Sequence, residues 1–222
     1  MRRLSQTIVI LVILFLPPLL CAKNIGLGCR ILNTQGFGGE ITGQIFERLN
    51  ARIGYNYYKF GFNIDVEDVN LDNELILSSA NFLADYFFIS DRWRFSAGII
   101  LNNNRTEILG AHTDTVLFGG LEIPPDELGN MTVNITFDKL APYLGIGYGN
   151  PVGEGRFAFV FDFGFFFQNS SNVSLKATGL IERTERNAYI IENNLKDFRF
   201  MPVISLGVAY RIFEHKLPSL KG

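Results

Sequence analysis

The hydrophobic pattern of this chain is most regular between Arg156 and Gln168, where phenylalanine occupies every second position. Successive side chains of a β-strand point to opposite faces, so the alternation puts an aromatic row on one face of a strand. A helix would spread the same rings around its whole circumference. At about 3.3 Å per residue and a tilt of about 40°, the stretch rises roughly 28 Å, which matches the apolar band of an outer-membrane barrel. We therefore expect a lipid-facing row that consists of Phe157, Phe159, Phe161, Phe163, Phe165 and Phe167.

Similar alternating segments recur along the chain and predict strands at 37–46, 50–63, 75–88, 93–102, 133–148, 156–168 and 199–213. Three of the joints between them are short (47–49, 89–92 and 150–155), whereas three are long and polar (64–73, 103–132 and 169–198). This alternation of short and long joints is typical of a transmembrane barrel with short periplasmic turns and longer outer loops. It disfavours the alternative, a soluble β-sandwich with the phenylalanine row in its core.

The number of strands follows from parity. Bacterial single-chain barrels have an even number of strands, with both ends in the periplasm. We therefore add residues 24–32 as a first strand, although their alternation is poor. The predicted fold is all-β: an eight-stranded antiparallel transmembrane β-barrel over residues 23–213, followed by a tail at 214–222.

Residues 1–22 resemble a secretory signal peptide, with two arginines followed by an apolar run from Ile8 to Leu20. That run is too short for a comfortable transmembrane helix. We expect cleavage after Ala22. Lipidation of Cys21 is the alternative, but Leu20 is the wrong residue in front of a lipidated cysteine. After cleavage only Cys29 remains, so an internal disulfide is excluded.

The last long joint differs from the others between residues 180 and 198, where charged residues and helix formers are frequent. Its apolar residues recur at roughly helical spacing: Ile181, Ala188, Ile191 and Leu195. This spacing predicts a short amphipathic helix within the last outer loop. The alternative is an upward extension of the neighbouring strands beyond the membrane.

The strand phases also predict which charged side chains point into the barrel: Glu40, Arg52, Asp85, Arg94, Asp162 and Arg211. Acids and bases balance in this set, and buried charges must pair or contact water. One hypothesis is a polar plug, because eight strands enclose barely enough room for their own side chains. The other is a narrow route for small cationic or zwitterionic solutes past Glu40 and Asp162.

Two separate motifs resemble a known family. Leu140-Ala-Pro-Tyr-Leu-Gly-Ile-Gly-Tyr-Gly-Asn-Pro151 is followed by the aromatic strand, by Asn172-Val-Ser-Leu175 and by Phe200-Met-Pro-Val-Ile-Ser-Leu-Gly-Val208. This order resembles the small outer-membrane barrels that include the CarO-type ornithine-uptake porins, over about Gly36 to Ile212. The resemblance implies an eight-stranded barrel in a Gram-negative outer membrane with a role in small-solute uptake, and it brings no catalytic motif.

We therefore expect a porin-like barrel for small solutes in the bacterial outer membrane. The alternative is a closed structural or surface-interaction barrel that acts through its outer loops. A lipid-modifying enzyme that uses His112 is a third hypothesis, but a single loop histidine is weak support, so we expect no enzyme activity, no metal and no cofactor. The expected partners are outer-membrane lipid, lipopolysaccharide and the barrel-assembly machinery. A net charge of −2 argues against nucleic acid.

Overall fold

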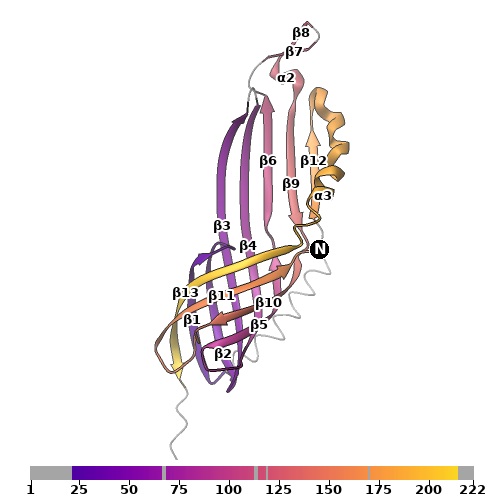
Figure 1. Cartoon of the computed structure of the whole chain (residues 1–222). Helices are drawn as coiled ribbons and strands as arrows, with labels where there is room; N and C mark the ends of the chain where they lie inside the picture. Colours follow the sequence, from indigo (N-terminus) through magenta and orange to yellow (C-terminus); the bar gives the residue numbers. More distant parts are fainter. Residues whose placement is uncertain (1–21, 67–68, 113–114, 119, 170, 215–222) are drawn as a thin grey trace, which may run out of the picture.

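The computed structural model describes residues 22–66, 69–112, 115–118, 120–169 and 171–214 (Figure 1). The expected signal peptide up to Cys21 and the expected tail after Glu214 lie outside the described residues. Within the described ranges, every helix is too short or too polar to cross a membrane.

Eight strands form a closed antiparallel ring, as the sequence predicts. In chain order they are β1 (Asn24–Asn33), β2 (Phe37–Phe46), β3 (Leu49–Val66), β4 (Val69–Phe87), β5 (Trp93–Asn102), β10 (Leu140–Tyr148), β11 (Phe157–Phe167) and β13 (Phe200–Glu214). Each strand pairs with the next, and β13 pairs with β1 to close the ring. The predicted short turns connect β2 to β3, β4 to β5 and β10 to β11. We call the end of the barrel with these turns the turn end, and the opposite end the loop end.

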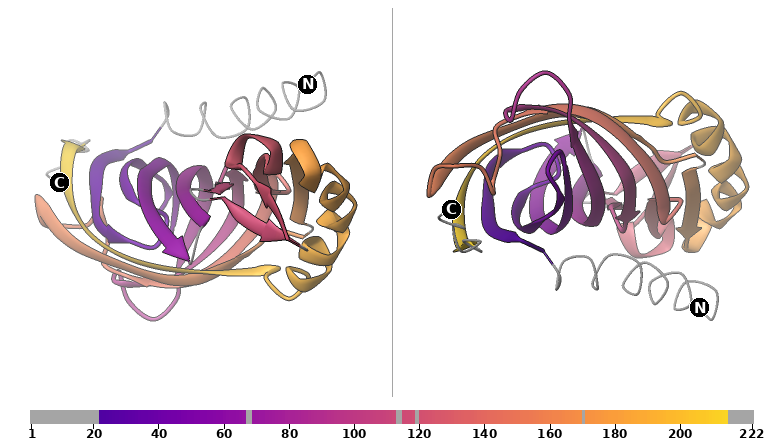
Figure 2. Two further views of the ribbon diagram at one scale, coloured as in Figure 1. Left: turned by 90° about the horizontal axis from the view of Figure 1, so that it is seen from above. Right: turned by 90° about the horizontal axis from the view of Figure 1, so that it is seen from below.

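A second, open sheet rises from the loop end, where the sequence analysis expected polar loops. It consists of the upper parts of β3 and β4 together with β6 (Arg105–His112), β9 (Asn130–Phe137) and β12 (Ser171–Ala177), in the order β3-β4-β6-β9-β12. We call it the upper sheet. Figure 1 shows it standing beyond the barrel, while β5, β10, β11 and β13 slant across the barrel below; Figure 2 gives the views along this direction.

The upper sheet corrects the predicted loops. The predicted loop 64–73 is wrong, because β3 continues to Val66 and β4 starts at Val69. The predicted loop 103–132 contains β6, the hairpin of β7 (Val116–Phe118) and β8 (Leu121–Ile123), the short helix α2 (Pro125–Leu128) and the start of β9. The predicted strand 133–148 is two strands, because the chain breaks between β9 and β10 at 138–139.

The backbone hydrogen bonds of β4 continue where the chain passes from β5 to β6. The Asn103 N–H donates to the carbonyl oxygen of Ser78 at 2.8 Å, and the Ser78 N–H donates to the Asn104 side-chain oxygen at 2.8 Å. Both backbone groups of Ser78 in β4 therefore stay satisfied where the chain leaves the barrel ladder. This corner lets one long strand serve first the barrel and then the upper sheet.

One face of the upper sheet is covered by η1 (Gly179–Asn187) and α3 (Ala188–Asn194). Figure 1 shows these helices beside β12. The four apolar residues that the sequence places at helical spacing (Ile181, Ala188, Ile191 and Leu195) pack against the buried residues Val133, Val173, Leu175 and Ala177 of β9 and β12. The sheet face, not intrinsic helix propensity, thus holds this short helical segment in place.

Candidate functional site

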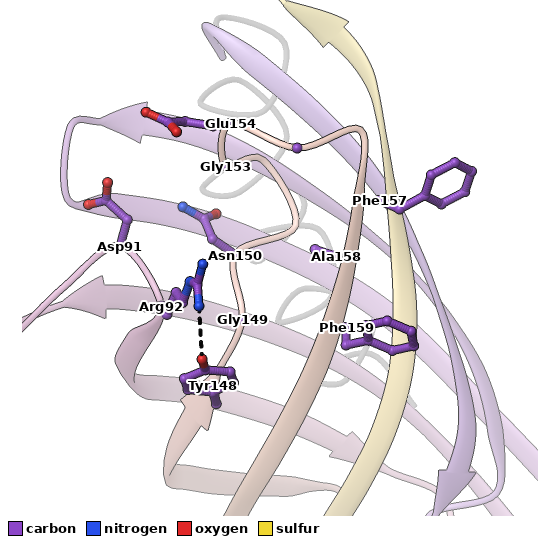
Figure 3. A pocket seen from close by; sticks show the side chains of 11 residues that line it. Asp91, Arg92, Tyr148, Gly149, Asn150, Gly153, Glu154, Phe157, Ala158 and Phe159 are labelled. Atoms are coloured by element: carbon purple, nitrogen blue, oxygen red, sulfur yellow. Dashed lines mark hydrogen bonds between the residues drawn. The ribbon is translucent and has the colours of Figure 1, made fainter.

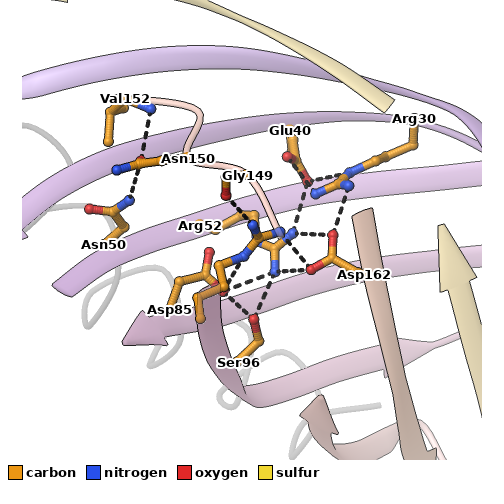
Figure 4. Close-up of polar contacts among 11 residues, drawn as sticks. Arg30, Glu40, Asn50, Arg52, Asp85, Ser96, Gly149, Asn150, Val152 and Asp162 are labelled. Carbon is orange, nitrogen blue, oxygen red and sulfur yellow. Dashed lines mark hydrogen bonds and ion pairs between the residues drawn. The ribbon is translucent and has the colours of Figure 1, made fainter. Parts of the chain in front are cut away.

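A network of six charged side chains crosses the barrel interior. It consists of Arg30, Glu40, Arg52, Asp85, Arg94 and Asp162, which come from β1, β2, β3, β4, β5 and β11 (Figure 4). We call it the ion-pair cluster. Each of these side chains is at most 5% exposed. Three arginines and three carboxylates give the cluster no net formal charge.

Asp162 is the centre of the cluster, because it contacts all three arginines. Its Oδ2 lies 2.7 Å from Nη1 of Arg30 and 3.0 Å from Nη1 of Arg52. Its Oδ1 accepts a hydrogen bond of 2.7 Å from Nη2 of Arg94. A buried carboxylate needs partners of this kind to offset its lost hydration.

The two other carboxylates complete the cluster. Glu40 accepts a bidentate pair of hydrogen bonds from Arg30, at 2.9 and 2.8 Å. Oδ1 of Asp85 accepts hydrogen bonds from Arg52 at 3.0 Å and from the Ser96 hydroxyl at 2.5 Å. Bidentate arginine pairs fix geometry as well as charge, so the cluster ties neighbouring strands to one register.

The turn between β10 and β11 folds across the turn end next to the cluster (Figure 4). Arg94 donates a hydrogen bond to the carbonyl oxygen of Gly149, and the side chain of Asn50 donates to the Asn150 side-chain oxygen at 3.3 Å. Val152, at the tip of this turn, is only 3% exposed. A Cβ added to Gly26 in β1 would lie 2.5 Å from the Pro151 carbonyl oxygen. The turn therefore seals this end against the barrel wall.

Above the cluster, the interior is filled by an apolar layer and then by amide side chains. The apolar layer is the buried set Leu83, Ile100, Ala141, Tyr143, Phe166 and Val203. The amide groups pair across the loop end, from Asn102 to Gln168 at 3.2 Å and from Asn104 to Gln35 at 3.1 Å. A narrow cavity of about 40 Å³ runs from the cluster past the apolar layer towards the loop end, lined by Arg30, Tyr143 and Gln35 among others. That volume suits on the order of one or two water molecules.

The aromatic row of β11 points away from this interior. Phe157 and Phe159 are the most exposed of the six rings, at 77% and 84%. The residues between the rings are buried or half-buried: Ala158, Val160, Asp162, Gly164 and Phe166. In a β-sandwich the aromatic row would be buried between two sheets. Here it lies on the outside of a closed ring, so the sandwich alternative is wrong.

Comparison with known proteins bears on the fold. The chain matches no protein-family model and no curated protein sequence. Among solved structures, CarO2 of Acinetobacter baumannii has 16% sequence identity and a TM-score of 0.57, over 85% of this chain and 98% of CarO2. CarO of the same organism has 17% identity and a TM-score of 0.54, over 86% of this chain and 98% of CarO.

The protein has the fold of the small outer-membrane β-barrels. A major outer membrane protein from Thermus thermophilus also matches, with 13% identity and a TM-score of 0.44 over 85% of this chain and 98% of that protein.

The interior of this outer-membrane-type barrel contains five of the six charges that the sequence placed there: Glu40, Arg52, Asp85, Arg94 and Asp162. The arginine side chains join the three carboxylates among them into one cluster. Arg211 lies elsewhere. It is half-buried, and its guanidinium donates to the carbonyl oxygens of Gly153 at 2.6 Å and Glu154 at 2.9 Å. Arg211 therefore anchors the β10–β11 turn.

Arg30 is the member of the cluster that sequence reasoning missed. The alternation of β1 is poor because its ladder with β13 shifts register between Arg30 and Leu32. The ladder with β2 is regular and places Gly28 opposite Glu40, so Arg30 has the same inward phase as its partner. The register between β1 and β2 identifies Arg30 as an inward residue, whereas the alternation within β1 alone does not.

A large pocket lies on the outside of the turn end, between the β4–β5 and β10–β11 turns (Figure 3). Its volume is about 530 Å³. Arg92 donates a hydrogen bond of 3.3 Å to the Tyr148 hydroxyl at its edge. The pocket carries charges of both signs, because Asp91 and Glu154 are exposed beside Arg92. Its lining residues include no member of the ion-pair cluster. This hollow is a surface feature of the turns and does not open the lumen.

Gly147 in β10 gives a direct test of how tightly the cluster is packed. A Cβ at this position would lie 2.7 Å from Cζ of Arg94 and 2.8 Å from Oδ1 of Asp162. We expect Gly147→Ala to lower the free energy of unfolding by about 1–3 kcal/mol, because overpacking displaces the central ion pair. Urea unfolding measures the loss. Gly39→Ala is the matched control, since a Cβ there meets nothing within 4 Å, and an equal loss in both variants would contradict tight packing.

Proposed function

We propose that this protein resides in the bacterial outer membrane as a barrel with a closed lumen, and that it acts through its upper sheet. The observation that carries the proposal is the ion-pair cluster, which fills the interior between the sealed turn end and the apolar layer. The outward rows of phenylalanine, leucine and isoleucine on β10, β11 and β13 support a lipid environment. By the rule for such barrels, the short turns face the periplasm and the upper sheet faces outward.

Solute permeation fits the interior less well. The carboxylates that would attract a cationic solute, Glu40 and Asp162, are already engaged by arginines. Separating such pairs costs several kcal/mol unless the incoming solute replaces every contact. Within the described residues, the lumen cavity of about 40 Å³ is far smaller than an amino acid needs. These features favour surface action over transport.

Planar-bilayer recording tests the closed lumen. We expect the purified protein to insert without producing stepwise conductance, and an open porin added later to the same bilayer should give steps and thereby validate the membrane. Liposome swelling with small cationic and zwitterionic amino acids should show the same impermeability. Reproducible unit conductance or swelling above protein-free liposomes would overturn the proposal and favour the permeation hypothesis.

A further inference from the structure

The upper part of β3 has an open edge. The ladder between β2 and β3 ends at the pair Phe37–Tyr57, whereas the ladder between β3 and β4 continues to Val66. Among the strands that the structure describes, residues 58–66 of β3 therefore pair with β4 alone. Figure 1 shows this edge as the free side of the upper sheet, opposite the helices beside β12. Proteins usually cover or blunt an edge of this length, because it is a template for another strand.

The hydrogen-bonding groups of this edge can be assigned from the ladder. The Phe87 N–H donates to the carbonyl oxygen of Arg48, and the β3–β4 register stays regular from there to Val66. In an antiparallel ladder, residues alternate between bonding to one neighbour and to the other. Even-numbered residues of β3 thus bond to β4, and the odd-numbered residues Lys59, Gly61, Asn63 and Asp65 turn their N–H and C=O groups to the open edge. Ser78 of β4 lies opposite Tyr57, and its N–H and C=O groups point away from β3 and bond to Asn104 and Asn103, as this phase requires.

The side chains of the edge form two contrasting faces. On one face, Tyr58, Phe60 and Phe62 are all exposed, with ring centroids 6.4 Å apart for the first pair and 5.6 Å for the second. Ile64 continues this face at 43% exposure. On the other face, Lys59 and Asp65 are both exposed and lie near opposite ends of the edge. The edge therefore carries an apolar strip and a charge at each end, of opposite sign.

This sequence is complementary to itself in the antiparallel direction. With Phe62 opposite the Phe62 of a second copy, Lys59 faces Asp65, Gly61 faces Asn63 and Phe60 faces Ile64. All odd-numbered residues then lie opposite odd-numbered ones, so each N–H of one β3 edge lies opposite a C=O of the other copy. We call this contact between the two edges the joint. Opposite charges and aromatic pairs directly across a ladder each stabilise it by about 0.2–1 kcal/mol, whereas like charges oppose it.

We propose that the β3 edges of two copies of this chain pair in this register and join two upper sheets into one. Because β3 runs away from its barrel, antiparallel pairing puts the two barrels at opposite ends of the joint. The two copies therefore belong to facing membranes, and the contact is one between cells. This inference rests on the proposed function, which places the upper sheet outside the cell.

Lys59 already has a partner in its own chain, since its Nζ lies 2.7 Å from a carboxylate oxygen of Glu74 on β4. Asp65 likewise accepts a hydrogen bond of 2.7 Å from the Asn70 side chain. Both contacts lie at the surface, where such pairs are weak, so they do not prevent either side chain from contacting an opposite charge of a second copy. They hold the two charged side chains in place beside the edge.

Aggregation of proteoliposomes tests the proposed pairing of the two β3 edges. Vesicles that carry the wild-type chain should aggregate, as followed by light scattering. Asp65→Lys puts like charges together at both ends of the joint, and so does Lys59→Asp. We expect each variant alone to aggregate about tenfold more slowly. A mixture of Asp65→Lys vesicles with Lys59→Asp vesicles should recover, because each lysine again faces an aspartate.

Asn63→Pro gives a second variant that acts through the backbone. It removes one edge N–H without changing charge, and proline is tolerated on edge strands, so it should abolish aggregation while the barrel stays folded on a heat-modifiability gel. Dispersed wild-type vesicles would overturn the proposal, as would equal aggregation by every variant or a mixture that does not recover. The outcome is independent of the conductance test, because a barrel that conducts can still aggregate and a closed one can stay dispersed.

Discussion

Replacing Asp162 with Asn is expected to lower the free energy of unfolding by about 3–5 kcal/mol. The change leaves three buried arginines, Arg30, Arg52 and Arg94, with only two carboxylates. Breaking a buried pair costs this much because the remaining charge has neither water nor a counter-ion. The measurement is urea unfolding in lipid vesicles or detergent, read from the midpoint at an unchanged slope.

Two companion variants make this test specific. Asp91→Asn, in the exposed β4–β5 turn, should change stability by less than about 0.5 kcal/mol. The double variant Asp162→Asn with Arg30→Gln restores the charge balance, so its loss should be smaller than the sum of the two single losses. A loss below about 1 kcal/mol for Asp162→Asn would mean that water, not the arginines, solvates this carboxylate.

Replacing Phe163 with Arg should cost about 2–4 kcal/mol, the second largest effect that we expect. Phe163 lies in the middle of β11, between Ile146 of β10 and Ile204 of β13, and its ring points outward. An arginine at the midplane of a bilayer must carry its charge into hydrocarbon, and the penalty falls towards the membrane surface.

Phe157→Arg is the matched control, because it makes the same chemical change near one end of the same strand and on the same face. Phe157 lies near the turn end opposite Tyr210, so the expected loss is only about 0–1 kcal/mol. Reversible unfolding in vesicles gives both values. Equal losses for the two variants would contradict a lipid-facing row with its centre in the bilayer.

The barrel was predictable from the sequence because lipid imposes a simple pattern. Phe157 to Phe167 must alternate, since one side of the strand meets hydrocarbon and the other a narrow interior. Parity then supplied β1 although its own alternation is poor. Phase alone also identified Glu40, Arg52, Asp85, Arg94 and Asp162 as interior charges, because a residue that alternates with outward apolar neighbours has only one direction to point.

The upper sheet was not predictable in the same way. Its strands β6 and β12 lie beyond the band of alternating apolar residues, so polar residues such as Ser174 occupy one face and the sequence looks like a loop. Most of β9 was predicted to be a strand, but as the first part of β10. Pairing partners that lie far away in the chain, such as Leu175 with Val133, decide that these residues are strands. Arg30 was missed for a related reason, since its phase depends on the ladder with β2.

The six side chains of the ion-pair cluster come from six different strands, and this has a consequence for assembly. Arg30 in β1 reaches Asp162 in β11 only when β13 has paired with both strands and closed the ring. An incomplete ring keeps these charges hydrated on the side that must later become dry, so its insertion into hydrocarbon is disfavoured. The cluster therefore favours insertion of the complete ring over insertion of a chain that lacks its closing strand.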